Sequence, residues 1–550
     1  MLTRIGSNNT AATVTNIYVG VNNIARRVVK AYVGVNGVAQ QIYSTSPTVY
    51  SMLYSDNSMT FQLAGTPDAS KTLVGKYNMA QNAHYTNNQN VPWYAHIANV
   101  QNVTFNSNIR PNSIAYWFDG ATSLKSLDAS KINGKNITNM QYAFNGCSGP
   151  SFNVINAPNA TNMAYAYSGC TNMTGTAVCG SKVTNMAGAY DRCYNVVGTS
   201  ACGAKVTDMT NAYSYSGVTT AVCGNNVVNM ASAYYKCSYL TGSPACGPNV
   251  TNMCEAYWYC SNLAGAPIVG NKVTDLSIAY RDTAVSGVAV CPNSVINMSQ
   301  AYLNTNITKA ACGPNVTNMS SAYASCYNLT TAVCGDNVTN FSSTYLACRN
   351  LKTAVCGKNV TSMSETYQSC YNLTTAACGV NVTNMSKTYQ HCSSLTKAVC
   401  GANVTSMVLT YANCANLTTP ACGNKVTSLV NTYKDCLKLT TAAFGSSVSV
   451  AMYAYANCPN IKGNIYVPSS NVANAWKCFN GRNASYRLNI YVPVNSTTFN
   501  TFTVRSQTSS LTGDGITWTN DTNSCYYNTQ RNIYIYPVAN VTATRAANGD

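Results

Sequence analysis

A short unit repeats with almost no filler through the middle of the chain. Residues 315–335, NVTNMSSAYASCYNLTTAVCG, form one copy, and related copies run from about residue 140 to residue 458. The aromatic residue of the AYxxC motif marks the register every 21 to 23 residues: Phe144, Tyr167, Tyr190, Tyr213, Tyr234, Tyr257, Tyr280, Tyr302, Tyr323, Tyr345, Tyr367, Tyr389, Tyr411, Tyr433 and Tyr455. Periods of about 20 to 29 residues are typical of solenoids, in which each unit forms one coil. The repeat therefore predicts one long array of about 15 coils in place of several globular domains.

Each unit also predicts its own secondary structure. Met319 lies four residues before Tyr323, a spacing that predicts a short helical turn with both side chains on one face. The NLTTAVCG segment that follows is β-rich, ends in glycine and predicts a strand. A coil of this length buries too little apolar surface to offset its conformational entropy, so it must stack on its neighbours. We therefore expect a ladder of stacked residues at the AYxxC tyrosines, including Tyr323, Tyr345 and Tyr367.

The early units differ from the later ones by one glycine at the entry of the predicted strand. The extra glycines are Gly175, Gly198, Gly242 and Gly265. A glycine inserted in a strand suits a β-bulge, because it tolerates the backbone conformation that a bulge requires. The early coils are therefore predicted to carry bulges that the later coils lack.

Most of the 26 cysteines fall into two rows. One row occupies the AYxxC place and includes Cys326 and Cys348, and the other occupies the strand place and includes Cys334 and Cys356. If the rows were joined by disulfides, their losses would be coupled, yet Cys312 remains where Thr305 replaces its neighbour. Buried free thiols, which pack as small apolar groups, are favoured over disulfides and over a metal site, which would need four converging ligands.

The charge pattern argues against nucleic-acid and membrane partners. The net charge of +17 arises because there are only 15 acidic residues; the lysines are scattered singly, and no run of four or more basic residues occurs. A duplex-binding protein would need a focused basic stripe. No apolar run reaches the length of a membrane span, and the first residues lack the apolar core of a secretory signal.

The residues offer little for catalysis. His84, His96 and His391 have no nearby pattern that would form a catalytic triad, and the scarce carboxylates are too dispersed to form a glycosidase pair. No phosphate-binding loop occurs. We therefore expect a protein that is not an enzyme and needs no cofactor.

The two ends of the chain differ from the array. Residues 14–43 hold a duplication, NIYVGVNNIARRVV and KAYVGVNGVAQQIY, that predicts two β-hairpins. After the array, the IYVP element occurs at Ile465 and Ile490, with a weaker copy at Asn532, and predicts β segments that close the exposed end. The expected organisation is a hairpin attachment module (1–45), a β-rich linker or cap (46–110), the solenoid (111–458) and a β-rich C-terminal cap (459–550).

One loop of the repeat is the candidate recognition site. The loop after the AYxxC cysteine holds four tyrosines and one arginine: Tyr194, Tyr239, Tyr327, Tyr371 and Arg349. Aromatic side chains in a row can stack against sugar rings or anchor a protein partner. The alternative is a packed or solvated edge without a ligand.

Two segments resemble known families. SIAYWFDGATSLKSLDASKINGKNITNMQYAFNGC and NMSSAYASCYNLTTAVCG resemble the BspA-like class of bacterial leucine-rich repeats, whose units run VTNMSxMFxxCxxLTxLDLS. The sequence departs from that class where TAVCG replaces LDLS. The duplicated YVGVNG segment resembles N-terminal segments of tail and other structural proteins of bacteriophages that infect Gram-positive hosts.

These resemblances imply adhesion in place of catalysis. We expect a phage virion structural protein, in the tail, a fibre or a head fibre, whose solenoid displays a surface for host attachment to a glycan or a protein. Its N-terminal module would bind other virion proteins, and the protein would form a homo-oligomer. The alternatives are a bacterial cell-surface leucine-rich-repeat adhesin and a capsid or tail decoration protein without receptor binding.

Overall fold

The computed structural model describes residues 18–21, 24–27, 30–35, 38–44, 48–80, 83–147, 155–503, 519–521, 525–528 and 530–549. The chain divides into two compact units, Met1–Asn172 and Met173–Asp550.

The first unit begins with two antiparallel strand pairs. Strand β1 (Tyr18–Val21) pairs with β2 (Ile24–Arg27), and β3 (Lys30–Val35) pairs with β4 (Val38–Ser44). These pairs occupy the places where the duplicated sequence predicts hairpins. The residues that would form the two turns lie outside the described part of the chain.

A five-stranded sheet follows, in the order β7-β5-β6-β8-β9. Its strands are β5 (Thr48–Tyr54), β6 (Ser58–Gln62), β7 (Leu73–Ala80), β8 (Asn102–Phe105) and β9 (Ser126–Asp128). Three short 3-10 helices accompany it: η1 (Asn88–Asn90), η2 (Tyr94–Asn99) and η3 (Gly134–Asn136). Phe61 fills the core beneath the sheet, with its ring stacked on Phe105 and Trp117 and edge-on to Trp93.

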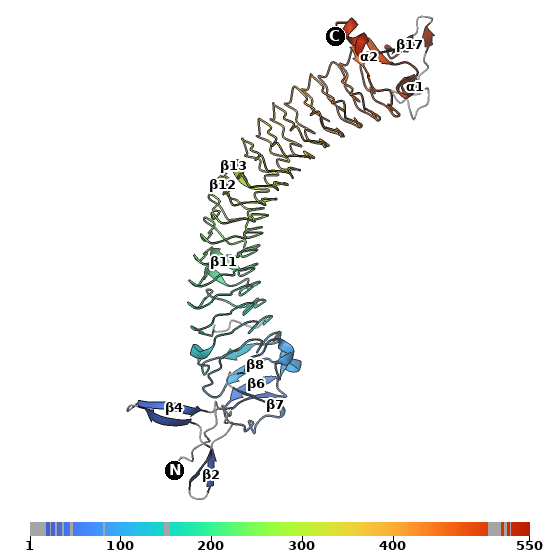
Figure 1. Ribbon diagram of the computed structural model, residues 1–550. Helices are drawn as coiled ribbons and strands as arrows, with labels where there is room; N and C mark the ends of the chain where they lie inside the picture. The colour runs from blue at the N-terminus through green and yellow to red at the C-terminus, as the bar shows by residue number, and fades with distance from the viewer. Residues whose placement is uncertain are drawn as a thin grey trace, which may run out of the picture. The chain divides into compact units, whose positions relative to one another are not determined.

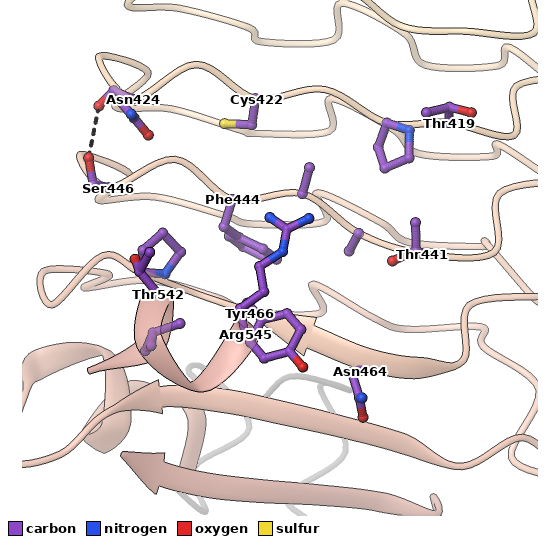
Figure 2. Close-up of a pocket in the computed structure, with 15 residues that line it drawn as sticks. Thr419, Cys422, Asn424, Thr441, Phe444, Ser446, Asn464, Tyr466, Thr542 and Arg545 are labelled. Carbon is purple, nitrogen blue, oxygen red and sulfur yellow. Dashed lines mark hydrogen bonds between the residues drawn. The ribbon is translucent and has the colours of Figure 1, made fainter. Parts of the chain in front are cut away.

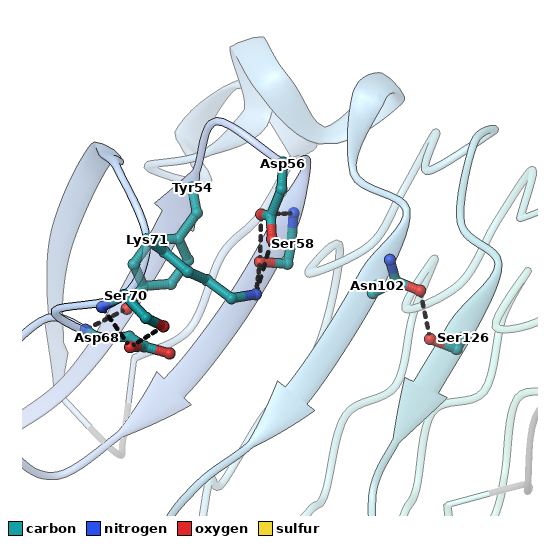
Figure 3. Close-up of polar contacts among 8 residues, drawn as sticks. All are labelled: Tyr54, Asp56, Ser58, Asp68, Ser70, Lys71, Asn102 and Ser126. Carbon is teal, nitrogen blue, oxygen red and sulfur yellow. Dashed lines mark hydrogen bonds and ion pairs between the residues drawn. The ribbon is translucent and has the colours of Figure 1, made fainter.

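Polar side chains bind the strands of this sheet to one another (Figure 3). Lys71 Nζ lies 2.8 Å from the Asp56 carboxylate, and Asn102 Oδ1 accepts a 2.7 Å hydrogen bond from Ser126 between β8 and β9. The hydrogen bond from Lys71 is the main cause that lowers the pKa of Asp56. Asp56 is thus a structural anion held in its charged form.

In the second unit, coils follow one another between β10 and β14 (Figure 1). The sequence prediction of a helical turn is wrong: residues 320–325 form a chain of turns in which Ser321 (φ 53°) and Ser325 (φ 61°) are left-handed. With this backbone, every second N–H points at the next coil. Thus Ser321 N donates to Ser342 O (3.0 Å) and Tyr323 N to Thr344 O (2.9 Å). An α-helix would use the same N–H groups internally and leave the coils unlinked.

The expected tyrosine ladder is present and fully buried. The Tyr345 ring lies 5.6 Å from that of Tyr323 and 5.5 Å from that of Tyr367, with stacked geometry. Met319, four residues before Tyr323, is buried as well. The spacing of these two residues therefore predicted the interior side chains of the coil correctly, although it predicted the wrong backbone between them.

The predicted strand forms only in some coils. The strands are β10 (Val197–Thr199), β11 (Gly217–Thr220), β12 (Ser286–Val288) and β13 (Asn306–Lys309), paired in parallel as β10-β11 and β12-β13. Later coils keep single bridges at this place, such as Thr353 with Thr375. The register shifts after Gly198 (φ 84°), as a bulge requires, and again after Gly287 (φ 87°), which the sequence analysis did not single out.

The two cysteine rows have different surroundings, and both contain free thiols, as at Cys326 and Cys334. In the AYxxC row the thiols are buried, and most of them donate to the ladder-residue carbonyl of the preceding coil, as from Cys348 Sγ to Tyr323 O (3.1 Å). In the strand row the thiols are half-buried, and several accept an N–H from the next coil, as Cys400 Sγ does from Gly423 N (3.1 Å). Both rows contribute to coil stacking.

The stack continues past residue 458, and β14 of the C-terminal sheet lies within this continuation of the chain. Val450 bridges to Asn474, and the Phe479 ring stacks 5.6 Å from that of Tyr455. The sheet has the order β14-β15-β18-β17-β16, formed by β14 (Gly463–Tyr466), β15 (Leu488–Pro493), β16 (Thr519–Asp521), β17 (Cys525–Asn528) and β18 (Ile533–Val538). Two helices accompany it, α1 (Thr497–Thr503) and α2 (Val541–Ala547). The three IY copies align in parallel, with Tyr466 beside Tyr491 and Tyr491 beside Tyr536.

Candidate functional site

Aromatic and cationic side chains gather on the outside of four consecutive coils of the second unit. They lie one or two residues after the ladder tyrosine of each coil. We call this group the Lys236 cluster: Tyr215, Tyr235, Lys236, Trp258, Tyr259 and Arg281.

The backbone places these side chains in one column. Tyr215, Lys236 and Tyr259 all occupy the left-handed position two residues after the ladder tyrosine, with φ between 56° and 60°. Their N–H groups donate to the next coil, at 2.7 Å from Tyr215 to Tyr235 O and 2.8 Å from Lys236 to Trp258 O. The spacing of the column is therefore fixed by the main chain.

Three rings surround the Lys236 ammonium. Its Nζ lies 5.0 Å from the ring centre of Tyr215, 5.2 Å from that of Tyr235 and 5.5 Å from that of Tyr259. It also donates a 3.2 Å hydrogen bond to Tyr215 Oη. This bond is the main cause that lowers the pKa of Tyr215 and raises the pKa of Lys236. Lys236 is accordingly held as a cation at neutral pH.

Trp258 extends the cluster onto the next coils. Its ring lies 5.0 Å from that of Tyr235 and 5.4 Å from that of Tyr259, and the Arg281 guanidinium lies 5.1 Å from its centre. Arg281 also pairs with Asp282 (3.1 Å). Because a carboxylate already accompanies Arg281, the surface combines aromatic faces with a small net charge.

The sequence-predicted residues are brought together only in part. The Arg349 guanidinium lies between Tyr327 (4.6 Å to the ring centre) and Tyr371 (5.9 Å), and we call these three residues the Arg349 stack. Tyr194 is exposed at the equivalent place, but its counterpart in the next coil is Gly217. The assignment of Tyr239 to this column is wrong, because Tyr239 aligns with Asn328, one residue further along the loop.

The Lys236 cluster was not predicted from the sequence, for an identifiable reason. The predicted site is the loop after the cysteine, whereas the cluster lies before the cysteine, in columns that hold small or polar residues in many other coils. Aligning all copies on the ladder tyrosine and comparing the two following columns would have shown four aromatic residues in three coils.

Neither aromatic group contains the parts of a known catalytic site. Within the described ranges, no three His, Cys, Asp or Glu residues converge as a metal site would require. The same part of the chain has no helix that is long and apolar enough to cross a membrane. The arrangement can therefore bind ligands by stacking and hydrogen bonding, which are its evident chemical capabilities.

Comparison with protein families places the repeat. Residues 295–418 match, in six copies, the family described as "BspA type Leucine rich repeat region". Residues 295–418 carry BspA-type leucine-rich repeats. This match confirms the repeat class expected from the sequence. Residues 112–221 match a second family, described as "Mycoplasma protein of unknown function".

Solved leucine-rich repeat structures are similar to this chain at low identity. A leucine-rich repeat protein from Bacteroides ovatus is 11% identical, with 75% of this chain and 97% of that chain covered and a TM-score of 0.38. A leucine rich cell surface protein from Faecalibacterium prausnitzii is 16% identical, with 60% and 93% covered and a TM-score of 0.34. A leucine-rich repeat protein from Eubacterium ventriosum is 15% identical, with 80% and 94% covered and a TM-score of 0.30.

A comparison with curated proteins found no match. None of the family and structure descriptions above refers to a virion or a bacteriophage. The virion setting expected from the YVGVNG segment therefore gains no support from these comparisons.

Proposed function

We propose that this BspA-type repeat protein is a non-enzymatic adhesion protein that binds carbohydrate on a cell surface through the Lys236 cluster. The observation that carries the proposal is the set of three rings around one ammonium, with Trp258 and Arg281 adjoining it. Sugar rings present apolar C–H faces that pack on aromatic planes, and their hydroxyls accept hydrogen bonds from cations. Both kinds of group are present in this cluster.

The rigidity of the column favours binding. Each of its left-handed residues is fixed by a main-chain hydrogen bond to the next coil, so little backbone entropy is lost when a ligand binds. The Arg349 stack offers a second, smaller surface of the same kind on later coils. Two such surfaces along one array can raise avidity for a polymeric glycan.

Two settings remain for this activity. A bacterial cell-surface adhesin agrees with the repeat class. A virion fibre rests on the duplicated hairpin segment β1–β4, which would serve as the attachment module for other virion proteins and for a homo-oligomer. Detection of the chain by antibody in purified particles, as opposed to the cell envelope, distinguishes the two settings.

A glycan-array experiment with the full-length protein tests the binding role. We expect binding to a subset of glycans, and a loss of about tenfold for Trp258→Ala and for Lys236→Gln, which corresponds to about 1.4 kcal/mol for a stacking or cation contact. Tyr239→Ala is the matched control, because Tyr239 is 65% exposed and lies outside the cluster. Its binding should stay within about twofold of the parent protein.

Two outcomes would contradict the proposal that the Lys236 cluster binds carbohydrate. If no glycan binds, or if the cluster variants bind as well as the control while all retain the parent melting temperature, the Lys236 cluster is not a recognition site. The second outcome would move the site elsewhere on the chain, and the first would favour a decoration protein without a receptor.

A further inference from the structure

A cavity of about 700 Å³ lies at the C-terminal end of the second unit (Figure 2). Three parts of the chain enclose it: the strand side of the last coils, strand β14 and helix α2. Its residues belong to none of the columns that form the Lys236 cluster or the Arg349 stack. Its volume is within the range of sites that hold small ligands.

The floor of the cavity exists because one residue breaks the strand-side cysteine row. Phe444 stands where the preceding coil has Cys422, and it is 7% exposed. Its ring lies 5.6 Å from that of Tyr455 and 6.5 Å from that of Phe502, so it is packed against the end of the ladder and against α1. The replacement of a small thiol by this ring gives the cavity a fixed apolar base.

An aromatic plate forms another wall. The Tyr466 ring stacks 5.0 Å from that of Tyr491, which stacks 5.1 Å from that of Tyr536. The Tyr466 hydroxyl accepts a 2.8 Å hydrogen bond from Asn548 Nδ2. The ring is therefore held at both its face and its hydroxyl end before any ligand arrives.

The charge of the lining is positive and comes from one residue. Among the described residues that line the cavity, Arg545 of α2 is charged and none is Asp or Glu. Its guanidinium lies 5.9 Å from the Tyr466 ring centre. Figure 2 shows Arg545 beside Tyr466 and Phe444, with Asn464 and Thr441 near the same space. An anionic ligand with hydroxyl groups complements these walls.

We propose that this cavity binds an acidic saccharide. The carboxylate of the sugar pairs with the Arg545 guanidinium, whose planar fork suits two parallel hydrogen bonds to a carboxylate. The sugar ring packs on Tyr466, and Asn464 and Thr441 hydrogen-bond its hydroxyls. This site stands independently of the Lys236 cluster, whose proposed ligands need no acidic group.

Other ligand classes fit the walls less well. A nucleotide would bring several phosphate charges to a single arginine, whereas phosphate sites combine several donors. A lipid would place its apolar chain against the polar side chains of Asn424, Ser446 and Asn464, at a cost in free energy. A small carboxylic acid would satisfy Arg545 and leave most of the cavity unfilled.

Saturation-transfer NMR of the full-length protein with four probes tests the proposal. The probes are glucuronic acid, which represents uronic acids within a polysaccharide, N-acetylneuraminic acid, which represents terminal acidic sugars, glucose and acetate. We expect at least one acidic sugar to bind at least tenfold more tightly than glucose and acetate, and to bind more weakly as salt is added. The stronger of the two acidic sugars identifies the source.

Substitutions locate the site. Arg545→Gln and Tyr466→Ala should each weaken binding of the acidic sugar by about tenfold. Lys438→Gln is the control, because it removes one positive charge from an exposed position outside the cavity lining. Equal binding of glucose or acetate, no binding of either acid, or unchanged binding by Arg545→Gln would each overturn the proposal. Array glycans bound through the Lys236 cluster should be unaffected by Arg545→Gln, so the two proposals fail separately.

Discussion

At the scale of single residues, the ladder needs tyrosine because its hydroxyl replaces missing sheet hydrogen bonds. The Tyr345 hydroxyl donates to Val333 O (2.5 Å) and accepts from Val333 N (2.9 Å), and the same pair of bonds recurs along the ladder. Val333 lies in the segment where a strand was expected and where the later coils form only single bridges. The side chain therefore satisfies both backbone groups that a continuous sheet would otherwise have paired.

The substitution Tyr345→Phe should open the chain locally at Val333. It keeps the stacked ring and removes both hydrogen bonds, so the local opening free energy should fall by about 1–3 kcal/mol. Hydrogen-exchange mass spectrometry of the peptide that contains Val333 measures this change. Tyr327→Phe is the control, because Tyr327 is 43% exposed, and it should leave exchange unchanged. Equal exchange in both variants would mean that the hydroxyl does not hold the segment.

At the scale of one element, the buried cysteine row explains why its members can be lost singly. Cys326 Sγ donates to Tyr302 O of the preceding coil (3.0 Å), whereas Thr305 Oγ1 donates to Tyr302 O of its own coil (2.7 Å). Thiol and hydroxyl thus satisfy the same carbonyl from two directions. A cysteine of the AYxxC row can therefore be replaced while the strand-row cysteine remains. Such uncoupled losses were the reason why the sequence favoured free thiols.

The row also predicts a loss of stability in alkali. Burial raises the pKa of Cys326 to about 11 and that of Cys458 to about 12, from 9.0. Because the folded pKa lies above the unfolded one, this stabilisation is complete below about pH 9 and is lost as the pH rises towards 11 to 12. Cys326→Thr should therefore lose less stability than the parent between pH 7.5 and pH 10, by about 1 kcal/mol in urea unfolding.

The matched control for this titration is Thr305→Ser, in the same row. Serine does not ionise in this range, so the difference in stability between Thr305→Ser and the parent should not change with pH. A difference that also stays constant for Cys326→Thr would show that the thiol is not buried as a neutral group.

The coil backbone marks the limit of what the sequence predicts. The Met319–Tyr323 spacing fits a helical turn, but it fits a chain of turns with left-handed residues at Ser321 and Ser325 equally well. The left-handed place two residues before the ladder tyrosine holds Ser321, Glu365, Lys387 and Leu409 in four of the coils, so glycine or asparagine does not consistently mark it. A positive φ raises the conformational free energy of such residues, and the hydrogen bonds to the next coil offset this increase. Those bonds belong to the stack and are not visible in one unit.

At the scale of the whole molecule, prediction was best where the information is periodic. The period, the repeat class and the interior rows follow from comparing copies. The C-terminal cavity does not, because it joins Phe444, Tyr466 and Arg545, which have no periodic relation. The Lys236 cluster is intermediate, since its columns are periodic while its aromatic residues are confined to a few coils. Sites on a solenoid are departures from the repeat, so the averaging that finds the fold hides them.

An array whose coils bond only to their neighbours should tolerate the loss of one complete coil. Deleting residues 382–403 removes Tyr389, which stacks 5.6 Å from Tyr367 and 5.4 Å from Tyr411, and lets Tyr411 take its place. Both aromatic groups and the C-terminal cavity keep their own residues. We expect a folded protein that resists trypsin as the parent does and melts within a few degrees of it.

Deleting residues 382–392, half a coil, should instead expose the following segment to trypsin, because every later side chain would lose its row. Equal proteolysis of the two deletions would show that stability depends on contacts beyond neighbouring coils.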